Sequence, residues 1–281
     1  LSNVCTHRGN LLIPNQGTCK SLICGYHGRK FNLKGEFEFM PEFKDAKNFP
    51  CEHDNLAEIP FAKFHNHLFT SLDPAFDFSE IADVMNRKTG FLPIENFKLD
   101  TSSSRDYLVN CNWALYCDNY LEGFHIPFVH RDLNAVLDYK NYGSEIYKYC
   151  NLQIGIADES TIAFDLPEDH EDYGKRVAAY YFWLFPNMMF NFYPWGLSVN
   201  VVKPLEVDKC KISFYSYIYD SSKIVDSAGA DIDKVEREDE AIVETVQKGL
   251  RSRFYEKGRF SPTMEKGVHH FHSLIDQFLN K

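Results

Sequence analysis

The sequence predicts an α+β protein, with a small all-β domain over residues 1–75 and a larger domain over residues 76–281 that combines helices with an antiparallel sheet. The first 75 residues are short apolar runs broken by Gly, Pro, Asn and Asp, which is typical of short strands and turns. Further along, runs rich in aromatic and β-branched residues alternate with turn residues, which indicates antiparallel strands. Helical periodicity flanks these runs on both sides.

The elements follow from these patterns in chain order. The run 71–74 (Ser-Leu-Asp-Pro) marks the domain boundary, because Asp-Pro favours a turn and helical periodicity begins directly after it. Apolar residues at three- and four-residue spacing predict helices over 77–87, 113–124, 235–250 and 268–279. Aromatic and β-branched runs predict strands over 161–164, 178–185, 188–193, 197–202 and 211–219.

Composition and charge exclude several classes of function. The chain has 281 residues, 44% of them hydrophobic, and no apolar run is long enough to cross a bilayer. A formal net charge of -10 opposes nucleic-acid binding, which requires clustered Lys and Arg. The eight cysteines are too sparse for a disulfide scaffold. We therefore expect a cytoplasmic protein that binds neither nucleic acid nor a membrane. Because Cys5 lies so close to the first residue, we also expect the N-terminal domain to lack its first strands.

Two pairs of metal-binding residue types stand near the start of the chain. Cys5-Thr6-His7 is followed after sixteen residues by Cys24-Gly25-Tyr26-His27. Thiolates and imidazoles in such tight pairs indicate a metal site, and a zinc site of Cys2His2 type is one alternative. Each pair mixes one Cys with one His, which favours an iron–sulfur cluster in which two cysteines hold one iron and two histidines the other.

A second constellation lies in the larger domain at Glu122, His125 and His130. On a regular helix Glu122 and His125 share a face, and Pro127 is expected to distort the helix so that both imidazoles point at one place. The alternative is that these are ordinary surface or core histidines and an exposed helical glutamate.

A candidate third ligand comes from the helix predicted over 235–250. Asp239 falls in the apolar stripe formed by Val235, Ile242, Val246 and Leu250, and a carboxylate that faces a core is costly unless it is paired or bound to metal. By contrast, Glu236, Arg237, Glu238 and Glu244 are expected to be solvated charges. The rivals, Asp276 and the histidine-rich run 269–272, lie beside apolar residues and are expected to serve packing, surface or subunit contacts.

The two cysteine–histidine pairs and their flanking residues resemble the oxygenase branch of the Rieske family. This resemblance implies a [2Fe–2S] cluster held by Cys5, His7, Cys24 and His27. It also implies a mononuclear Fe(II) held by His125, His130 and Asp239, since the family has an acidic pair, here Glu238-Asp239, whose second member binds iron. The larger domain is then expected to have the helix-grip (START-like) fold.

The resemblance further implies how such a protein works. It would be a homotrimeric oxygenase that uses O2 and electrons from a separate NAD(P)H-dependent reductase, directly or through a ferredoxin, to hydroxylate a small organic substrate, an aromatic ring or an amine. Glu122 would be the bridge that carries electrons between the two metal sites of neighbouring subunits. Ring-dihydroxylating members usually have Asp there, so the glutamate resembles the branch that oxidises choline and carnitine.

The substrate site and the function have alternatives. Four aromatic residues are expected either to form a cage for a cationic substrate or to be sheet core: Phe190, Phe192, Tyr193 and Trp195. The rival functions are a Rieske electron-transfer protein whose second domain has lost its iron, and a helix-grip ligand-binding protein without oxygenase activity. The presence of His125, His130 and Asp239 favours the oxygenase over both.

Overall fold

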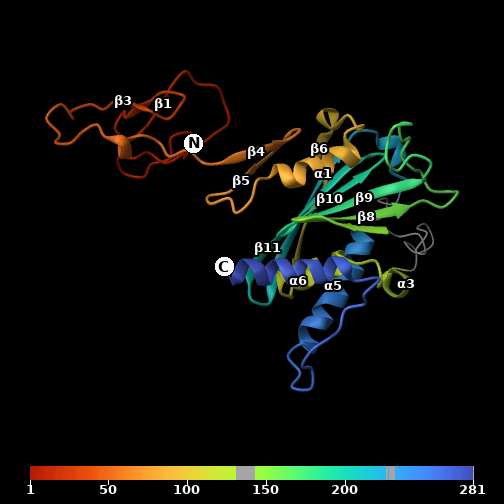
Figure 1. Ribbon diagram of the computed structural model, residues 1–281. Coiled ribbons are helices and arrows are strands. Elements are labelled where there is room, and N and C mark those ends of the chain that lie inside the picture. Colours follow the sequence, from red (N-terminus) through yellow and green to blue (C-terminus); the bar gives the residue numbers. More distant parts are fainter. Residues whose placement is uncertain (131–142, 226, 228–231, 281) are drawn as a thin grey trace. The chain divides into compact units, whose positions relative to one another are not determined.

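The structure is a computed structural model that describes residues 1–130, 143–225, 227 and 232–280 (Figure 1). The chain divides into two compact units, Leu1–Asp77 and Phe78–Lys281. The N-terminal unit holds both cysteine–histidine pairs, and the C-terminal unit holds Glu122 and the three candidate ligands of the second site.

The N-terminal unit is built from short antiparallel strands. Its three-stranded sheet has the order β1-β2-β3, and β4 pairs with β5 in a separate hairpin. The strands are β1 (Leu22–Ile23), β2 (Lys30–Phe31), β3 (Phe37–Phe39), β4 (Phe61–Phe64) and β5 (His67–Thr70), with one 3-10 turn at Glu52–Asp54. The core of the unit contains both cysteines of the paired motifs together with Leu12, Phe31 and Leu56. The candidate cluster ligands are therefore anchored in the centre of this small unit.

A buried arginine stabilises the same unit. The Arg29 side chain is almost wholly buried and forms an ion pair with Asp54. Its guanidinium also lies 5.0 Å from the centre of the Phe37 ring and 5.4 Å from that of Phe49, at cation–π distance. Because Arg29 directly follows Gly28, this arrangement fixes the end of the second cysteine–histidine loop against the 3-10 turn.

The C-terminal unit contains a seven-stranded antiparallel sheet with the order β6-β12-β11-β10-β9-β8-β7. The strands are β6 (Lys98–Val109), β7 (Gly143–Ile146), β8 (Cys150–Ile156), β9 (Val177–Leu184), β10 (Met188–Tyr193), β11 (Gly196–Glu206) and β12 (Lys209–Ile218). Strands β7 to β12 pair with their chain neighbours, and only β6 pairs out of sequence, on the far side of β12. The predicted α+β class with an antiparallel sheet is confirmed.

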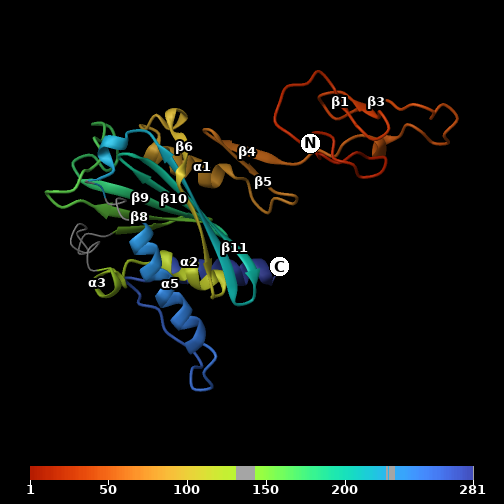
Figure 2. The ribbon, with the colours of Figure 1, turned by 180° about the vertical axis from the view of Figure 1, so that it is seen from behind.

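Helices pack on both sides of this sheet. They are α1 (Ser79–Thr89), α2 (Trp113–Tyr120), α3 (Ile126–Val129), α5 (Ile232–Gly249) and α6 (Lys266–Leu279), with 3-10 turns at Ile94–Asn96 and Ser221–Lys223. In both views α2, α5 and α6 lie on one side of the sheet and α1 on the other (Figures 1 and 2). None of the helices that the structure describes combines the length and the apolar character needed to cross a membrane.

The structure corrects several predicted elements. Residues 161–164 form no strand, although the Phe164 N–H donates to the Val177 carbonyl over 2.8 Å beside the start of β9. The helix predicted over 113–124 ends at Tyr120. The prediction also missed β6, β7 and β8, the first of which is rich in Ser and charged residues because it is a largely exposed edge strand.

The buried face of α5 also differs from the predicted one. Ile242, Val246 and Leu250 are 39%, 42% and 41% exposed, whereas Val243 and Glu236 are only 2% and 3% exposed. The helix is therefore rotated by about one residue, or about 100°, from the orientation that the apolar stripe predicts. The expectation that Glu236 is a solvated charge is wrong, because its carboxylate accepts a hydrogen bond of 2.5 Å from the buried Tyr116 hydroxyl.

Candidate metal centres

The two cysteine–histidine loops of the N-terminal unit have matching backbone geometry. The Cys5 and Cys24 N–H groups each donate over 2.8 Å to a carbonyl five residues later, and a glycine N–H donates back to each cysteine carbonyl over 3.0 Å. These glycines, Gly9 and Gly28, have φ of 70° and 73°, a left-handed conformation that favours glycine. The repeated Cys-x-His-x-Gly and Cys-x-x-His-Gly sequences thus build two similar turns that present their side chains toward one another.

The four candidate ligand side chains of this unit lie together. Cys5 and Cys24 are buried, and the ring centres of His7 and His27 lie 4.8 Å apart. Nδ1 of His27 is buried and has no hydrogen-bond partner among the described residues. A buried polar atom without a partner is costly, and a metal bond would satisfy it. Two thiols, two imidazoles and this unpartnered nitrogen fit a histidine-ligated iron–sulfur cluster.

The two thiols have different acidities. Burial raises the pKa of Cys5, and the neighbouring Cys24 thiol raises it further. Burial also opposes ionisation of Cys24, but its pKa is nevertheless lowered by hydrogen bonds from the backbone N–H groups of Tyr26 and His27, from Cys5 and from the Asn10 side chain. The second loop is therefore the more favourable environment for a negatively charged sulfur.

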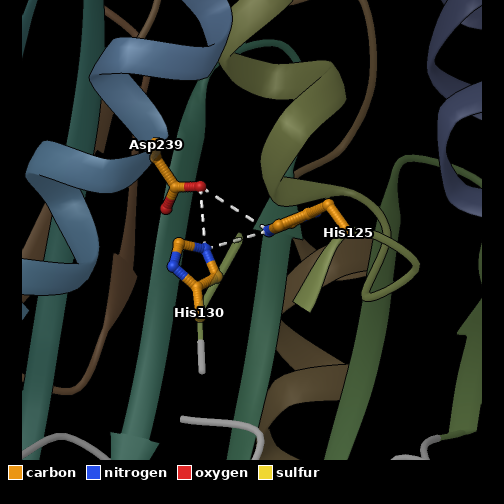
Figure 3. Close-up of side chains that lie close together, drawn as sticks. All are labelled: His125, His130 and Asp239. Carbon is orange, nitrogen blue, oxygen red and sulfur yellow. Dashed lines mark hydrogen bonds and ion pairs between the residues drawn. The ribbon is translucent and has the colours of Figure 1, made fainter. Parts of the chain in front are cut away.

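In the C-terminal unit, His125, His130 and Asp239 converge on one point (Figure 3). The two histidines stand on either side of the single turn of α3, and Asp239 projects from α5. His130 Nε2 lies 3.2 Å from His125 Nε2 and 3.0 Å from Asp239 Oδ1, and the remaining distance, from His125 Nε2 to Asp239 Oδ1, is 3.5 Å.

This spacing suits a metal ion with free coordination positions. Bonds of about 2.1 Å at right angles would place ligand atoms about 3 Å apart, close to the distances between these three. Three ligands on one face of a metal leave its other positions open, as in the 2-His-1-carboxylate arrangement of non-heme Fe(II) oxygenases. The residues of this site therefore fit a mononuclear iron.

A further residue contacts each of the three side chains. Glu122 Oε1 lies 2.7 Å from His125 Nδ1, and Glu238 Oε2 lies 2.8 Å from His130 Nδ1. The third side chain, Asp239, accepts a hydrogen bond of 2.6 Å from Asn119 at Oδ1, the oxygen that also lies 3.0 Å from His130 Nε2. Burial lowers the pKa of His130, but Asp239 and Glu238 outweigh this effect and raise it. Glu122 and Glu238 contact the Nδ1 atoms, so they fix the orientation of the two imidazoles and leave each Nε2 facing the metal position.

Sequence reasoning missed two of these residues. Glu238 was expected to be solvated, yet it contacts the almost wholly buried His130. The only signal for it was its position next to Asp239. Asn119 had no signal of its own, because it lies on α2 and reaches Asp239 only when α2 and α5 are packed together.

The surroundings of Glu122 also differ from the expectation. This residue lies in the turn between α2 and α3 rather than on a continuous helix face. Its Oε2 accepts hydrogen bonds from the backbone N–H groups of Phe124 and, over 3.1 Å, of His125.

Pro127 stands in the first turn of α3, where a missing N–H costs no helical hydrogen bond, so it does not kink a longer helix.

The rival ligands lie elsewhere in the unit. Asp276 accepts a hydrogen bond of 2.8 Å from Asn280 at the end of α6. In the histidine-rich run, His270 bonds Asn151 and His272 bonds Asp118, so both serve contacts between α6 and the rest of the unit.

The four aromatic residues considered for a cage are buried and divided between the two faces of the sheet. Side chains alternate along a strand, so Phe190 and Phe192 lie on the opposite face of β10 from Tyr193. Trp195, beyond the end of the strand, stacks on Tyr193 with ring centres 5.0 Å apart. All four are buried, and Tyr193 and Trp195 belong to a core cluster with Ala179. This burial matches the alternative that the four side chains are sheet core.

Comparison with known families identifies both parts of the chain. Residues 93–281 match the ring hydroxylating alpha subunit (catalytic domain), and residues 1–50 match the Rieske [2Fe-2S] domain. The first match covers more than half of the chain, so the chain belongs to the ring-hydroxylating alpha subunit family. The predicted resemblance to Rieske oxygenases is confirmed.

The chain is similar to choline and carnitine monooxygenases over almost its whole length. Choline monooxygenase of Arabidopsis thaliana is 31% identical over 97% of this chain and 67% of its own length. The enzyme of Beta vulgaris is 29% identical over 99% of this chain but only 63% of its own length, so the chain spans less than two thirds of that relative. The carnitine monooxygenase oxygenase subunit of Escherichia coli K12 is 28% identical over 98% of this chain and 76% of its own length.

Solved structures share the fold. A quaternary ammonium Rieske monooxygenase, reported for insights into carnitine oxidation and inter-subunit electron transfer, has a TM-score of 0.74 at 24% identity and covers 98% of this chain and 77% of its own. Naphthalene 1,2-dioxygenase from Rhodococcus sp. has a TM-score of 0.67 at 16% identity and covers 99% of this chain and 80% of its own.

Proposed function

We propose that this protein is the oxygenase component of a Rieske non-heme iron system, with a cluster domain at 1–75 and a catalytic domain at 76–281. The observation that carries the proposal is the convergence of His125, His130 and Asp239 in a chain whose N-terminal unit gathers two Cys–His pairs. When bound, a Rieske cluster supplies single electrons, and Fe(II) held by two histidines and a carboxylate supplies open positions for dioxygen and substrate.

The residues around the mononuclear site have defined tasks in this proposal. Glu122 and Glu238 hold the two imidazoles so that both Nε2 atoms face the metal, and Asn119 positions the Asp239 carboxylate through a hydrogen bond to Oδ1. Glu122 also serves as the bridge to a cluster-ligand histidine of a neighbouring subunit. Both of its oxygens already accept hydrogen bonds within the chain, but each carboxylate oxygen has a second lone pair for such a partner.

The surface of α5 carries exposed apolar side chains that an oligomer could bury. Ile242 and Val246 of α5 and Leu250 directly after it are 39%, 42% and 41% exposed at four-residue spacing, and Phe254, farther along the chain, is 83% exposed. Exposed apolar side chains that gather on one surface mark protein–protein contacts. These side chains support an oligomer, and we propose a homotrimer in which the cluster of one subunit serves the iron of the next. A separate NAD(P)H-dependent reductase, directly or through a ferredoxin, would supply the electrons.

We propose a small amine as the substrate class, in preference to an aromatic ring. The support is the glutamate at position 122 and the similarity over most of the chain to choline and carnitine monooxygenases. The test is O2-dependent hydroxylation of choline, carnitine and naphthalene by the purified protein with a surrogate reductase, together with iron and acid-labile sulfide analysis. Turnover of an amine with both iron sites present is expected. Stoichiometric zinc without sulfide, or no oxygen consumption with any substrate by the iron-loaded protein, would contradict the proposal.

A further inference from the structure

Both cysteines of the N-terminal unit receive similar hydrogen bonds from their own loops. The backbone N–H groups of His7 and Arg8 lower the pKa of Cys5, and those of Tyr26 and His27 lower the pKa of Cys24. These donors are set by the backbone conformation of the turn and do not depend on the side chains that the turn carries. Backbone donors therefore act on both sulfurs.

One side chain breaks this symmetry. Nδ2 of Asn10 lies 3.6 Å from the sulfur of Cys24, within hydrogen-bond distance for a sulfur acceptor. No other side-chain N–H is in hydrogen-bond contact with either sulfur among the residues that the structure describes. The contact crosses from the first cysteine–histidine loop to the second, so it depends on the fold of the unit rather than on local sequence.

The Asn10 amide is held in place for this contact. Its backbone carbonyl accepts a hydrogen bond of 2.8 Å from the Cys5 N–H, and its Nδ2 also donates to the Leu11 carbonyl over 2.9 Å. The side chain is half-buried. Its donor is therefore positioned at the second sulfur by two independent contacts to the first loop.

We propose that Asn10 tunes the reduction potential of the cluster by donating a hydrogen bond to the sulfur of Cys24. Reduction adds negative charge that is shared by the sulfur ligands, and a hydrogen bond to a charged acceptor is stronger than one to a neutral acceptor. The Asn10 N–H therefore stabilises the reduced cluster more than the oxidised one and raises the potential. This inference rests on the proposed cluster at Cys5, His7, Cys24 and His27.

Asn3 offers a matched control in the same unit. Its side chain donates to the Ile13 carbonyl over 2.8 Å and accepts from the Ile13 N–H over 2.9 Å. It therefore fastens the same stretch of chain through an amide, yet it has no contact with either sulfur among the described residues. A substitution there loosens the loop without removing a hydrogen bond to the cluster.

The experiment is an anaerobic redox titration of the full-length protein, followed by visible absorbance and by the paramagnetic signal of the reduced cluster. Asn10→Leu, which keeps the volume but removes the donor, and Asn10→Asp, which also adds a negative charge, should both lower the midpoint potential, Asp by more. Asn3→Ala should leave it unchanged. An unchanged potential in Asn10→Leu would overturn the inference, as would loss of the cluster in both Asn10 variants, since Asn10 would then hold the loop rather than tune the cluster. Absence of sulfide from the unsubstituted protein would instead refute the proposed function.

Discussion

Consecutive residues of α5 hold the two nitrogens of one imidazole. Nδ1 of His130 lies 2.8 Å from Glu238 Oε2, and Nε2 of the same ring lies 3.0 Å from Asp239 Oδ1. Glu238 therefore fixes the tautomer and the plane of the His130 ring. Asp239 and His130 Nε2 lie together at the position where a metal would bind. The order Glu-Asp on one helix thus supplies a positioning residue and a candidate ligand together.

Glu238→Ala should weaken Fe(II) binding by roughly 10- to 100-fold, because His130 would lose the partner that orients it. Glu238→Gln keeps an acceptor and should have a smaller effect. The measurement is anaerobic titration of the iron-free protein with Fe(II). Lys248, exposed near the end of the same helix, provides the control as Lys248→Ala. Equal affinities for Glu238→Ala and this control would show that the contact does not position the ring.

Glu122→Gln should leave both metal sites occupied but slow the electron transfer between them. A glutamine retains an oxygen that can accept the backbone hydrogen bonds of the turn, so the fold should be preserved, whereas the charge shared by the proposed bridge is lost. Single-turnover measurement with the cluster reduced beforehand follows this step directly. An unchanged rate would show that Glu122 is a local turn residue that only orients His125.

The contact between His272 on α6 and Asp118 on α2 should make stability depend on pH. The hydrogen bond from His272 to Asp118 raises the histidine pKa above its ordinary value of 6.5. This stabilisation is fully present below pH 6.5 and is lost as the pH rises through the raised pKa. Burial also raises the pKa of Asp118, so the charged carboxylate is costly and relies on the protonated histidine.

The measurement is the free energy of unfolding in urea at about pH 6 and about pH 8. The unsubstituted protein should lose stability over this interval, and Asp118→Asn should lose less of it. Because His272 is half-exposed, the effect should be modest. An identical pH dependence in both proteins would assign the loss to other groups.

The cluster loops and the strongest strands could be predicted from sequence because their signals are local. The Cys5 and Cys24 motifs contain their own turn glycines, and the strand predicted over 188–193 coincides with β10. By contrast, β6 was missed because an edge strand with polar side chains lacks the hydrophobic pattern of a buried one. Its place in the sheet depends on pairing with β12, which lies about a hundred residues later in the chain.

The candidate iron site shows the same division. His125 and His130 are close in sequence, and their spacing indicated a shared site. Asp239 was proposed for a partly wrong reason, since the apolar stripe that includes it is more exposed than Val243 and Glu236. It nevertheless lies at the edge of the inward face, and only the packing of α5 against α2 brings it to the histidines and to Asn119. Side-chain positions that depend on such packing have no signature in the sequence of either helix.

The most direct test of the account is the metal content of Asp239→Ala beside that of Asp276→Ala. Two neutral imidazoles bind Fe(II) weakly without a carboxylate, so Asp239→Ala should lose the mononuclear iron and the oxygenation activity. It should keep two irons and two sulfides per chain, because the cluster ligands lie in the other unit. Asp276→Ala should retain all three irons. Full mononuclear iron and activity in Asp239→Ala, with their loss in Asp276→Ala, would contradict the assignment.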